Sequence, residues 1–221
     1  MNELYIVGTG PGSPEYLTEQ AKRAISEARI VVGWEFNFQP VRSITSGKRV
    51  FLQDAKNYLQ VAEEAAVEAR KTGFPVAVLR VGDPCISSGL AGLQEIFHDF
   101  EIKIIPGISS VQMGAALAQI NIDDSVIISF HETGVEEKRN FMVDAYRRNR
   151  HLILLTGPEQ VPGQTASYLI EHGVNPSAEA IVCESISLPE EKISRGTLAD
   201  IAGQQFSWLS LMVVKAKRSN I

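Results

Sequence analysis

Three short segments rich in glycine, proline, serine and aspartate carry residue types that can bind a small molecule. They cover residues 8–13, 82–89 and 106–110, and each follows an apolar run that is typical of a buried strand. In an open α/β sheet, ligands bind at the loops beyond the carboxyl ends of the strands. The sequence therefore predicts that these three loops contribute to a small-molecule site.

The second and third loops offer specific binding groups. Gly82 lets the backbone come close to a ligand, and Asp83 can accept a hydrogen bond from a ribose hydroxyl or an ammonium group. Ser109 and Ser110 can donate to a carboxylate, and the N-terminus of the helix that follows also favours an anion. The same aspartate and serines can instead cap the helices that follow, so both roles stay open.

The first loop resembles part of a dinucleotide-binding fingerprint, with Gly-x-Gly-x-Gly at residues 8–12. The full pattern G-x-G-x-x-G places its third glycine at position 13, which is Ser13 here. Pro11 also lacks the backbone N–H that a pyrophosphate would need. Glu35 nevertheless lies where a ribose-binding acid would be, so a nicotinamide-dependent oxidoreductase is an alternative function, and a tight structural turn is the alternative without a ligand.

Composition and charge limit the class of partner. The 221 residues are 44% hydrophobic with a formal net charge of −5, which predicts a globular protein and disfavours nucleic acid and anionic membranes as partners. No apolar run reaches the ~18 residues of a membrane span and no charged leader precedes the first strand, so a cytoplasmic protein is expected. Cys85, Cys183 and four scattered histidines predict reduced thiols and no protein-bound metal.

Strand and helix patterns alternate along the first half of the chain, which predicts a mostly parallel sheet with right-handed crossovers. Strands are expected at residues 4–7, 30–32, 76–81 and 102–105, and helices at 17–28, 54–71 and 89–98. Residues 34–53 have no clear pattern beyond a possible strand near 48–51.

The second half becomes richer in strands toward its end. Helices are expected at residues 111–118, 136–147 and 164–171, and strands at 125–130, 152–155, 178–183, 191–195 and 209–215. This pattern predicts a mixed sheet with a hairpin-like pair near its end. We therefore expect an α/β protein of two domains, residues 1–107 and 108–221.

Four motifs, in order along the chain, resemble those of the tetrapyrrole methylases. They are Ile-Val-Gly-Thr-Gly-Pro-Gly-Ser-Pro-Glu-Tyr-Leu-Thr at residues 6–18, Gly-Asp-Pro at 82–84, Pro-Gly-Ile-Ser-Ser-Val-Gln at 106–112 and Arg-Gly-Thr-Leu at 195–198. The resemblance implies a two-domain α/β methyltransferase that binds S-adenosylmethionine in the cleft between its domains. Residues 108–112, 129–131 and 183–193 are most similar to the branch that methylates C5 of a cobalt-precorrin in cobalamin biosynthesis.

The resemblance also implies roles for individual residues, as well as a homodimer. The methyl donor would contact Gly82, Asp83, Ile86, Ser110, Val111, Thr156, Glu184 and Thr197. The tetrapyrrole would contact Gly10, Pro11, Gly12 and Arg80, with Arg42, Lys48 and Arg49 as further partners for its carboxylates. His131 is the candidate catalytic base. Another precorrin is the alternative acceptor, and the C15-methylating, decarboxylating domain of the fused form would be a separate partner.

Overall fold

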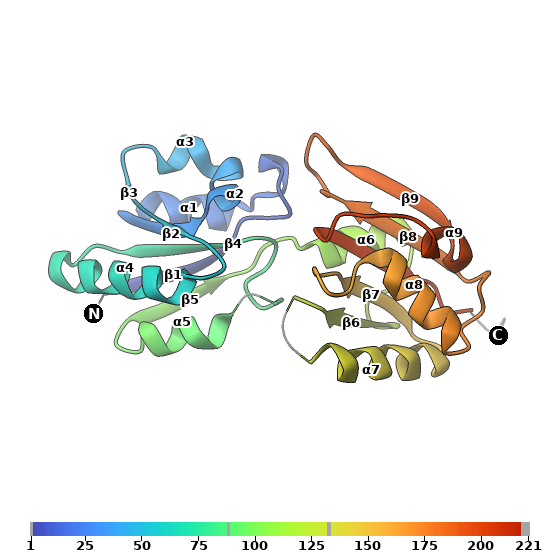
Figure 1. The fold of residues 1–221 in the computed structure, drawn as a ribbon. Helices are drawn as coiled ribbons and strands as arrows, with labels where there is room; N and C mark the ends of the chain where they lie inside the picture. The colour runs from blue at the N-terminus through green and yellow to red at the C-terminus, as the bar shows by residue number, and fades with distance from the viewer. Residues whose placement is uncertain (1, 88, 132–133, 218–221) are drawn as a thin grey trace. The chain divides into compact units, whose positions relative to one another are not determined.

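The computed structural model describes residues 2–87, 89–131 and 134–217, and the chain divides into two compact units (Figure 1). The units are Met1–Ser109 and Ser110–Ile221, a division two residues after the expected boundary between 107 and 108. Each unit has its own five-stranded sheet. The α/β class, with a parallel first sheet and a mixed second sheet, is confirmed. No helix within the described ranges combines the length and apolarity that a bilayer span requires.

The sheet of the first unit is entirely parallel. Its strands are β1 (Glu3–Gly8), β2 (Ile30–Trp34), β3 (Arg49–Gln53), β4 (Val76–Arg80) and β5 (Glu101–Ile105). They lie in the order β3-β2-β4-β1-β5, so β1 pairs with β4 on one side and with β5 on the other. Because parallel strands end at the same edge of a sheet, the loops after β4, β1 and β5 begin as neighbours.

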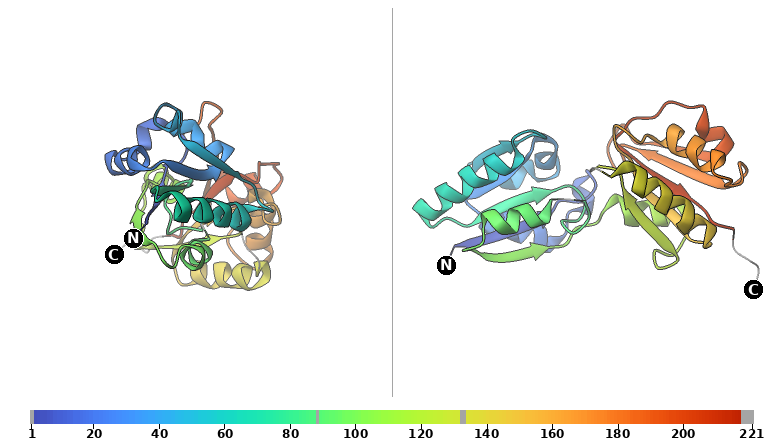
Figure 2. Two further views of the ribbon diagram at one scale, coloured as in Figure 1. Left: turned by 90° about the vertical axis from the view of Figure 1, so that its left-hand side faces the viewer. Right: turned by 60° about the horizontal axis from the view of Figure 1, so that its bottom comes forward.

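Both faces of this sheet are covered by helices. They are α1 (Glu19–Glu27), α2 (Glu35–Phe38), α3 (Arg42–Thr45), α4 (Tyr58–Thr72) and α5 (Leu90–Ile96), with 3₁₀ turns at Pro14–Tyr16 and Gln39–Val41. Alternate residues of β1 separate the two cores: Leu4 and Ile6 pack with α4 and α5, whereas Tyr5 and Val7 pack with α1. Figure 2 shows α4 and α5 together on their side of the sheet. Burial on both faces explains the nearly unbroken aliphatic strands.

Side-chain caps set the ends of the predicted helices. The Thr18 hydroxyl accepts the Ala21 N–H at 3.1 Å, as a helix N-cap does. The helix expected from residue 54 begins instead at Tyr58, because Asp54 accepts the N–H groups of Lys56 and Asn57 and forms a turn. Gly73 ends α4 in the left-handed conformation, at φ 70°.

The second unit has a mixed sheet. Its strands are β6 (Ser125–Ser129), β7 (His151–Leu155), β8 (Glu179–Glu184), β9 (Lys192–Thr197) and β10 (Ser210–Val214). The order is β6-β7-β10-β8-β9: β6 and β7 are parallel, whereas β10 runs antiparallel to both β7 and β8. The expected hairpin is β8–β9, an antiparallel pair. The ends of β6, β7 and β8 therefore share one edge with the starts of β9 and β10.

The helices of the second unit also lie on both faces of its sheet. They are α6 (Ser110–Ala118), α7 (Val135–Arg147), α8 (Pro162–Glu171) and α9 (Leu198–Ala202). Residues of α7, α8 and α9 share a core with Met212 and Val214 of β10. The helix α6 packs on the other face, where a Cβ on Gly114 would lie only 2.1 Å from the Leu211 side chain. Gly114 therefore permits the close approach of α6 to β10.

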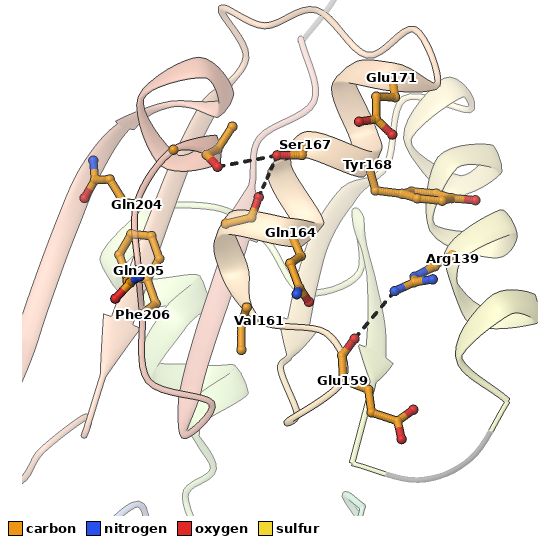
Figure 3. A pocket seen from close by; sticks show the side chains of 13 residues that line it. Arg139, Glu159, Val161, Gln164, Ser167, Tyr168, Glu171, Gln204, Gln205 and Phe206 are labelled. Atoms are coloured by element: carbon orange, nitrogen blue, oxygen red, sulfur yellow. Dashed lines mark hydrogen bonds between the residues drawn. The ribbon is translucent and has the colours of Figure 1, made fainter.

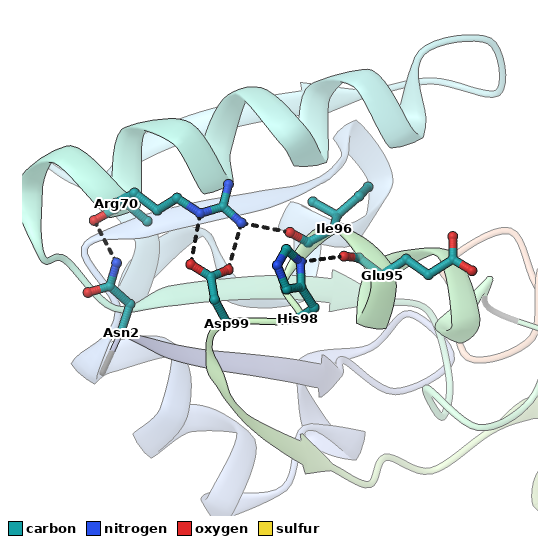
Figure 4. A network of polar contacts seen from close by, with 7 residues as sticks. Asn2, Arg70, Glu95, Ile96, His98 and Asp99 are labelled. Carbon is teal, nitrogen blue, oxygen red and sulfur yellow. Dashed lines mark hydrogen bonds and ion pairs between the residues drawn. The ribbon is translucent and has the colours of Figure 1, made fainter.

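A polar network joins α4 to the end of α5 (Figure 4). Arg70 donates to both carboxylate oxygens of Asp99, at 3.0 and 2.7 Å, and to the Ile96 carbonyl at 2.9 Å. This bidentate contact lowers the pKa of Asp99 to about 2. The network fixes the turn that leads from α5 into β5.

We expect Asp99→Asn to lower the melting temperature slightly at neutral pH, because Arg70 loses its anionic partner. A depressed folded pKa contributes stability above the unfolded value of about 3.9, and this contribution disappears as pH falls toward about 2. The melting temperatures of the parent and the variant should therefore converge between pH 4 and pH 2. Thermal unfolding by circular dichroism tests this, and a difference that stays constant over that range would contradict it.

Candidate functional site

The loop after β1 is held against the end of β4 by backbone hydrogen bonds. Both the N–H and the hydroxyl of Thr9 donate to the Arg80 carbonyl, at 2.8 and 3.1 Å. Gly82 then donates its N–H to the Gly10 carbonyl at 2.8 Å. The first two glycine-containing loops predicted from the sequence therefore run side by side beyond the sheet.

Three glycines allow the loops after β1, β4 and β5 to come closer than side chains would permit. A Cβ built on Gly107 would lie 2.2 Å from the Gly82 carbonyl oxygen. One built on Gly8 would lie 2.5 Å from the same oxygen and 2.7 Å from the Gly107 nitrogen. All of these neighbours are backbone atoms, so only glycine fits at both positions. Because of this close packing, backbone atoms and small side chains form the part of the edge where the three loops meet.

Asp83 connects the second loop to the third. One carboxylate oxygen accepts the Cys85 N–H at 2.8 Å, and the other accepts the Gly107 N–H at 3.1 Å. Ile86 closes the turn by donating its N–H to the Asp83 carbonyl at 3.1 Å. Asp83 therefore fixes the shape of both loops, whatever else its carboxylate contacts.

In the second unit, two predicted residues hold the segment that precedes β10. The buried Thr156 hydroxyl donates to the carbonyls of Trp208 and Ser210, at 3.0 and 2.8 Å. One oxygen of Glu184 accepts the Ser207 N–H at 2.8 Å, and the other lies 3.8 Å from the Lys192 ammonium. Thr156 and Glu184 follow or end parallel strands, so they lie at the same edge of the second sheet.

His131 lies at this edge too, just after β6. It is exposed, and its backbone N–H donates to the Ser129 hydroxyl at 3.3 Å. Of the two cysteines, Cys183 is buried in β8, where desolvation raises the pKa of its thiol to about 11, whereas Cys85 is exposed in the second loop. Within the described ranges, no group of three or more histidine, cysteine, aspartate or glutamate side chains is placed to hold a metal ion.

Comparison with known proteins assigns this arrangement to a family. The family model of the Tetrapyrrole (Corrin/Porphyrin) Methylases matches residues 3–202. The chain belongs to the tetrapyrrole methylase family. Members of this family are methyltransferases that use S-adenosylmethionine, and this chain is one of them.

Relatives of known sequence and structure agree with this assignment. A protein of Methanocaldococcus jannaschii named probable cobalt-precorrin-7 C(5)-methyltransferase is 35% identical over 95% of this chain and 96% of its own length. The methyltransferase CobJ has the same fold, with a TM-score of 0.81 at 22% identity over 98% of this chain and 95% of that one. The uroporphyrin-III C-methyltransferase of Thermus thermophilus, solved with S-adenosylhomocysteine, has a TM-score of 0.75 at 21% identity over 97% and 92%.

In this methylase the Arg80 side chain is buried and bonds to other residues of the first unit. Its side chain is 7% exposed and donates to the Gln53 amide oxygen and to the Leu79 carbonyl, both at 3.0 Å. Burial lowers the pKa of Arg80 to about 10. Because Gln53 donates to the Tyr58 carbonyl and the Arg80 carbonyl holds Thr9, Arg80 links three loops at this edge. These contacts give Arg80 a role in holding the loops, and its predicted contact with a substrate carboxylate stays a prediction.

The three other cationic residues predicted to contact substrate carboxylates lie at two places in the first unit. Arg49 begins β3 and pairs with Glu68 at 2.6 Å, and the Lys48 ammonium donates to the carbonyls of Ser26 and Ala28. Both lie at the start of β3, which is the opposite edge of the sheet from the glycine loops. Arg42 is exposed and lies 3.7 Å from Glu35. Lys48 and Arg49 therefore lie away from the loops that contain Gly10 and Gly82, whereas Arg42 follows the turn at Gln39–Val41, which contacts the turn at Pro14–Tyr16.

Thr197 is also separated from the other predicted donor residues. In the β8–β9 pair Thr197 lies opposite Glu179, at the start of β8, whereas Glu184 lies opposite Lys192. A six-residue strand rises about 3.3 Å per residue, so its two ends are roughly 16 Å apart. Thr197 instead caps α9, where its hydroxyl accepts the Asp200 N–H at 3.2 Å.

Ser110 and Val111 begin the second unit, in the first turn of α6. Val111 is buried, whereas Ser110 is partly exposed. Gly10, Pro11 and Gly12 form the turn after β1 that leads to the 3₁₀ turn at Pro14–Tyr16. The helix α1 begins only at Glu19, so this turn does not lead directly into a helix N-terminus as a dinucleotide fingerprint would.

Sequence reasoning missed several residues that shape the two edges. Thr9 and Gln53 hold the loops of the first unit. Trp208 lies beside Thr156 in the second unit. Ser109, expected to donate to a carboxylate or to cap a helix, is instead buried against Gly82. Thr9 lies within a predicted motif, so its position could have signalled a role. Gln53 and Trp208 lie in segments without a motif and could not be found in this way.

A cavity of about 670 Å³ lies elsewhere in the second unit, beside α8 (Figure 3). Its lining includes Arg139, Tyr168, Gln204 and Phe206, and it contains none of the predicted site residues. The Ser167 hydroxyl donates within it to the carbonyls of Gly163 and Ala202. Both bonds go to backbone carbonyls of the helices α8 and α9, which border the cavity.

Proposed function

We propose that this methylase transfers a methyl group from S-adenosylmethionine to C5 of cobalt-precorrin-7, a step of cobalamin biosynthesis. The observation that carries the choice of acceptor is the 35% identity, over nearly the whole of both chains, with a relative of that name. The crowded glycine loops of the first unit support the choice of donor, because their backbone can approach a nucleoside closely.

The proposed chemistry requires mainly positioning from the protein. The methyl group of the donor is already activated as a sulfonium, and the electron-rich macrocycle supplies the attacking carbon, so no covalent enzyme nucleophile is needed. Holding reacting atoms in line and near contact can contribute ~7–11 kcal/mol to catalysis. Cobalt would enter this reaction as part of the substrate.

We propose that residues of both units bind the donor. In the first unit these are Gly82, Asp83 and Ile86, which the bonds of Asp83 hold in one fixed turn. In the second unit they are Ser110, Val111, Thr156 and Glu184. We propose that Gly10, Pro11 and Gly12 contact the tetrapyrrole.

We propose that this methylase is a cytoplasmic homodimer that acts alongside a separate C15-methylating, decarboxylating enzyme, and kinship with the family supports this. Of three aromatic residues near the end of β2, Trp34, Phe36 and Phe38, the last is buried in the core of the first unit. Phe36 is half exposed and lies 5.4 Å from the Trp34 ring, between ring centres. A partly exposed aromatic pair of this kind suits a contact with a second copy.

Calorimetric titration separates the proposed function from the alternative oxidoreductase. S-adenosylhomocysteine should bind, and NADH should not. Methyl transfer should then be measured with cobalt-precorrin-7 and, as a matched acceptor, cobalt-precorrin-4. Turnover of cobalt-precorrin-4 alone would reassign the acceptor, and NADH binding without S-adenosylhomocysteine binding would overturn the proposal as a whole.

We further propose that His131 accepts the proton released when the ring carbon is methylated. His131 is exposed just after the end of β6, at the same edge as Thr156 and Glu184. His131→Asn should lower kcat by about 10²-fold or more with the donor saturated, the range of general base catalysis, and leave S-adenosylhomocysteine affinity unchanged. An unchanged kcat would remove His131 from the mechanism.

A further inference from the structure

An exposed aromatic side chain lies at the same edge of the second sheet as Thr156 and Glu184. Trp208 is 50% exposed, and the adjacent Leu209 is 47% exposed. Together the two side chains form a small exposed apolar surface beside the predicted donor residues. We propose that Trp208 forms a stacking platform for the flat face of the tetrapyrrole, an inference that rests on the proposed function.

The backbone that carries Trp208 is fixed on both sides by residues from neighbouring strands. The Trp208 carbonyl accepts the Thr156 hydroxyl from the end of β7 at 3.0 Å. The preceding Ser207 donates its N–H to Glu184 at the end of β8. Ser207 also accepts the Leu209 N–H with its hydroxyl at 3.2 Å, and its carbonyl accepts the hydroxyl of Ser210. An indole on a fixed backbone loses little conformational freedom when a ring stacks on it.

The loop between β8 and β9 adds backbone strain at the same edge. Ser185 and Ser187 adopt positive φ values of 49° and 65°, which non-glycine residues rarely do. Ser185 donates its N–H to the Leu209 carbonyl at 3.5 Å, so the strained loop contacts the segment of Trp208. Strained backbone of this kind is concentrated at ligand sites.

The charges at this edge favour contact with the apolar face of the macrocycle over contact with its peripheral carboxylates. Glu184, Glu190 and Glu191 lie in or beside the β8–β9 loop, and Lys192 is the cation next to them. This excess of acids would repel substrate carboxylates. A ring that presents its face to Trp208 and Leu209 avoids this repulsion and gains aromatic stacking.

Trp208→Ala should raise the KM for cobalt-precorrin-7 about tenfold, while the affinity for S-adenosylhomocysteine stays within twofold of the parent. Trp208→Phe keeps an aromatic face and should recover most of the loss. Phe141→Ala is the matched control, because Phe141 is 54% exposed on α7, away from this edge, and its loss should leave KM unchanged. Equal melting temperatures of the three variants would show that each one folds.

Three results would overturn the platform. They are an unchanged KM in Trp208→Ala, a loss of donor affinity as large as the change in KM, and no recovery in Trp208→Phe. The second result would assign Trp208 to donor binding through Thr156 and Glu184. Failure of the proposed function is distinguished from these outcomes, because in that case the parent enzyme itself would not methylate cobalt-precorrin-7.

Discussion

Replacing Gly107 with alanine is expected to lower donor affinity by more than a hundredfold and to destabilise the first unit. The added Cβ would lie 2.2 Å from the Gly82 carbonyl oxygen and 2.9 Å from the Cα of Gly8. Both neighbours are backbone atoms, which cannot rotate away as a flexible side chain would. Overpacking of this kind costs about 1–3 kcal/mol, and the loops must separate to relieve it.

Separation of the loops is what should remove donor binding. The third loop would have to move away from the second. The Gly107 N–H of the third loop bonds to Asp83 of the second, and Gly82 of the second loop bonds to Gly10 of the first. Calorimetry with S-adenosylhomocysteine and thermal unfolding measure the two effects. Gly203→Ala is the control, since nothing lies within 4 Å of its Cβ position and its φ is −93°. Donor affinity in Gly107→Ala equal to that of the control would contradict the role of this close packing.

The loops of the first unit could be predicted because the signal for each one is local. A run of aliphatic residues followed by a glycine cluster indicates a buried strand and its loop, and parallel strands place such loops at one edge. The strand order is not local. It depends on which sheet neighbours bury the most apolar surface. The position of β1 between β4 and β5 therefore could not be predicted from the sequence.

Arg80 and Thr197 show two further limits of the sequence. An arginine that ends a strand has the same sequence signature whether or not its guanidinium also bonds inside its own unit, as the Arg80 guanidinium does to Gln53. A threonine that ends a strand lies at the ligand edge only when the strand runs parallel to the others. Because β9 turns back from β8, its end carries Thr197 to the opposite edge. Pairing direction depends on tertiary packing, and the Arg-Gly-Thr-Leu motif does not encode it.

The late start of α4 has a more local cause. The apolar spacing predicts a helix from residue 54, but Asp54 and Asn57 bond the backbone of their own turn, including the Asn57 amide oxygen on the Asp54 N–H at 2.7 Å. Aspartate and asparagine compete with helical hydrogen bonds in this way. The resulting turn leads from Gln53 to Tyr58, the two residues through which Arg80 reaches this loop.

Asp83→Asn is expected to reduce S-adenosylhomocysteine affinity by about tenfold to a hundredfold. Each carboxylate oxygen accepts one backbone N–H, from Cys85 and from Gly107. An amide has one oxygen, so its NH₂ group would face one of these donors and that bond would be lost. Hydrogen bonds to charged groups contribute ~1.5–3 kcal/mol, which sets the expected range.

The matched control is Asp200→Asn, in which a carboxylate that also accepts a backbone N–H, from Thr197, is neutralised in the second unit. Its effect on donor affinity should be less than twofold, because it caps α9 at the edge opposite Glu184. Comparing the two variants distinguishes two causes of a lower donor affinity. One is the loss of any carboxylate that caps a turn, and the other is the loss of the connection between the second and third loops. If both reduced donor affinity equally, the Asp83 bridge would not be what shapes the donor site, and its two hydrogen bonds would be ordinary turn contacts.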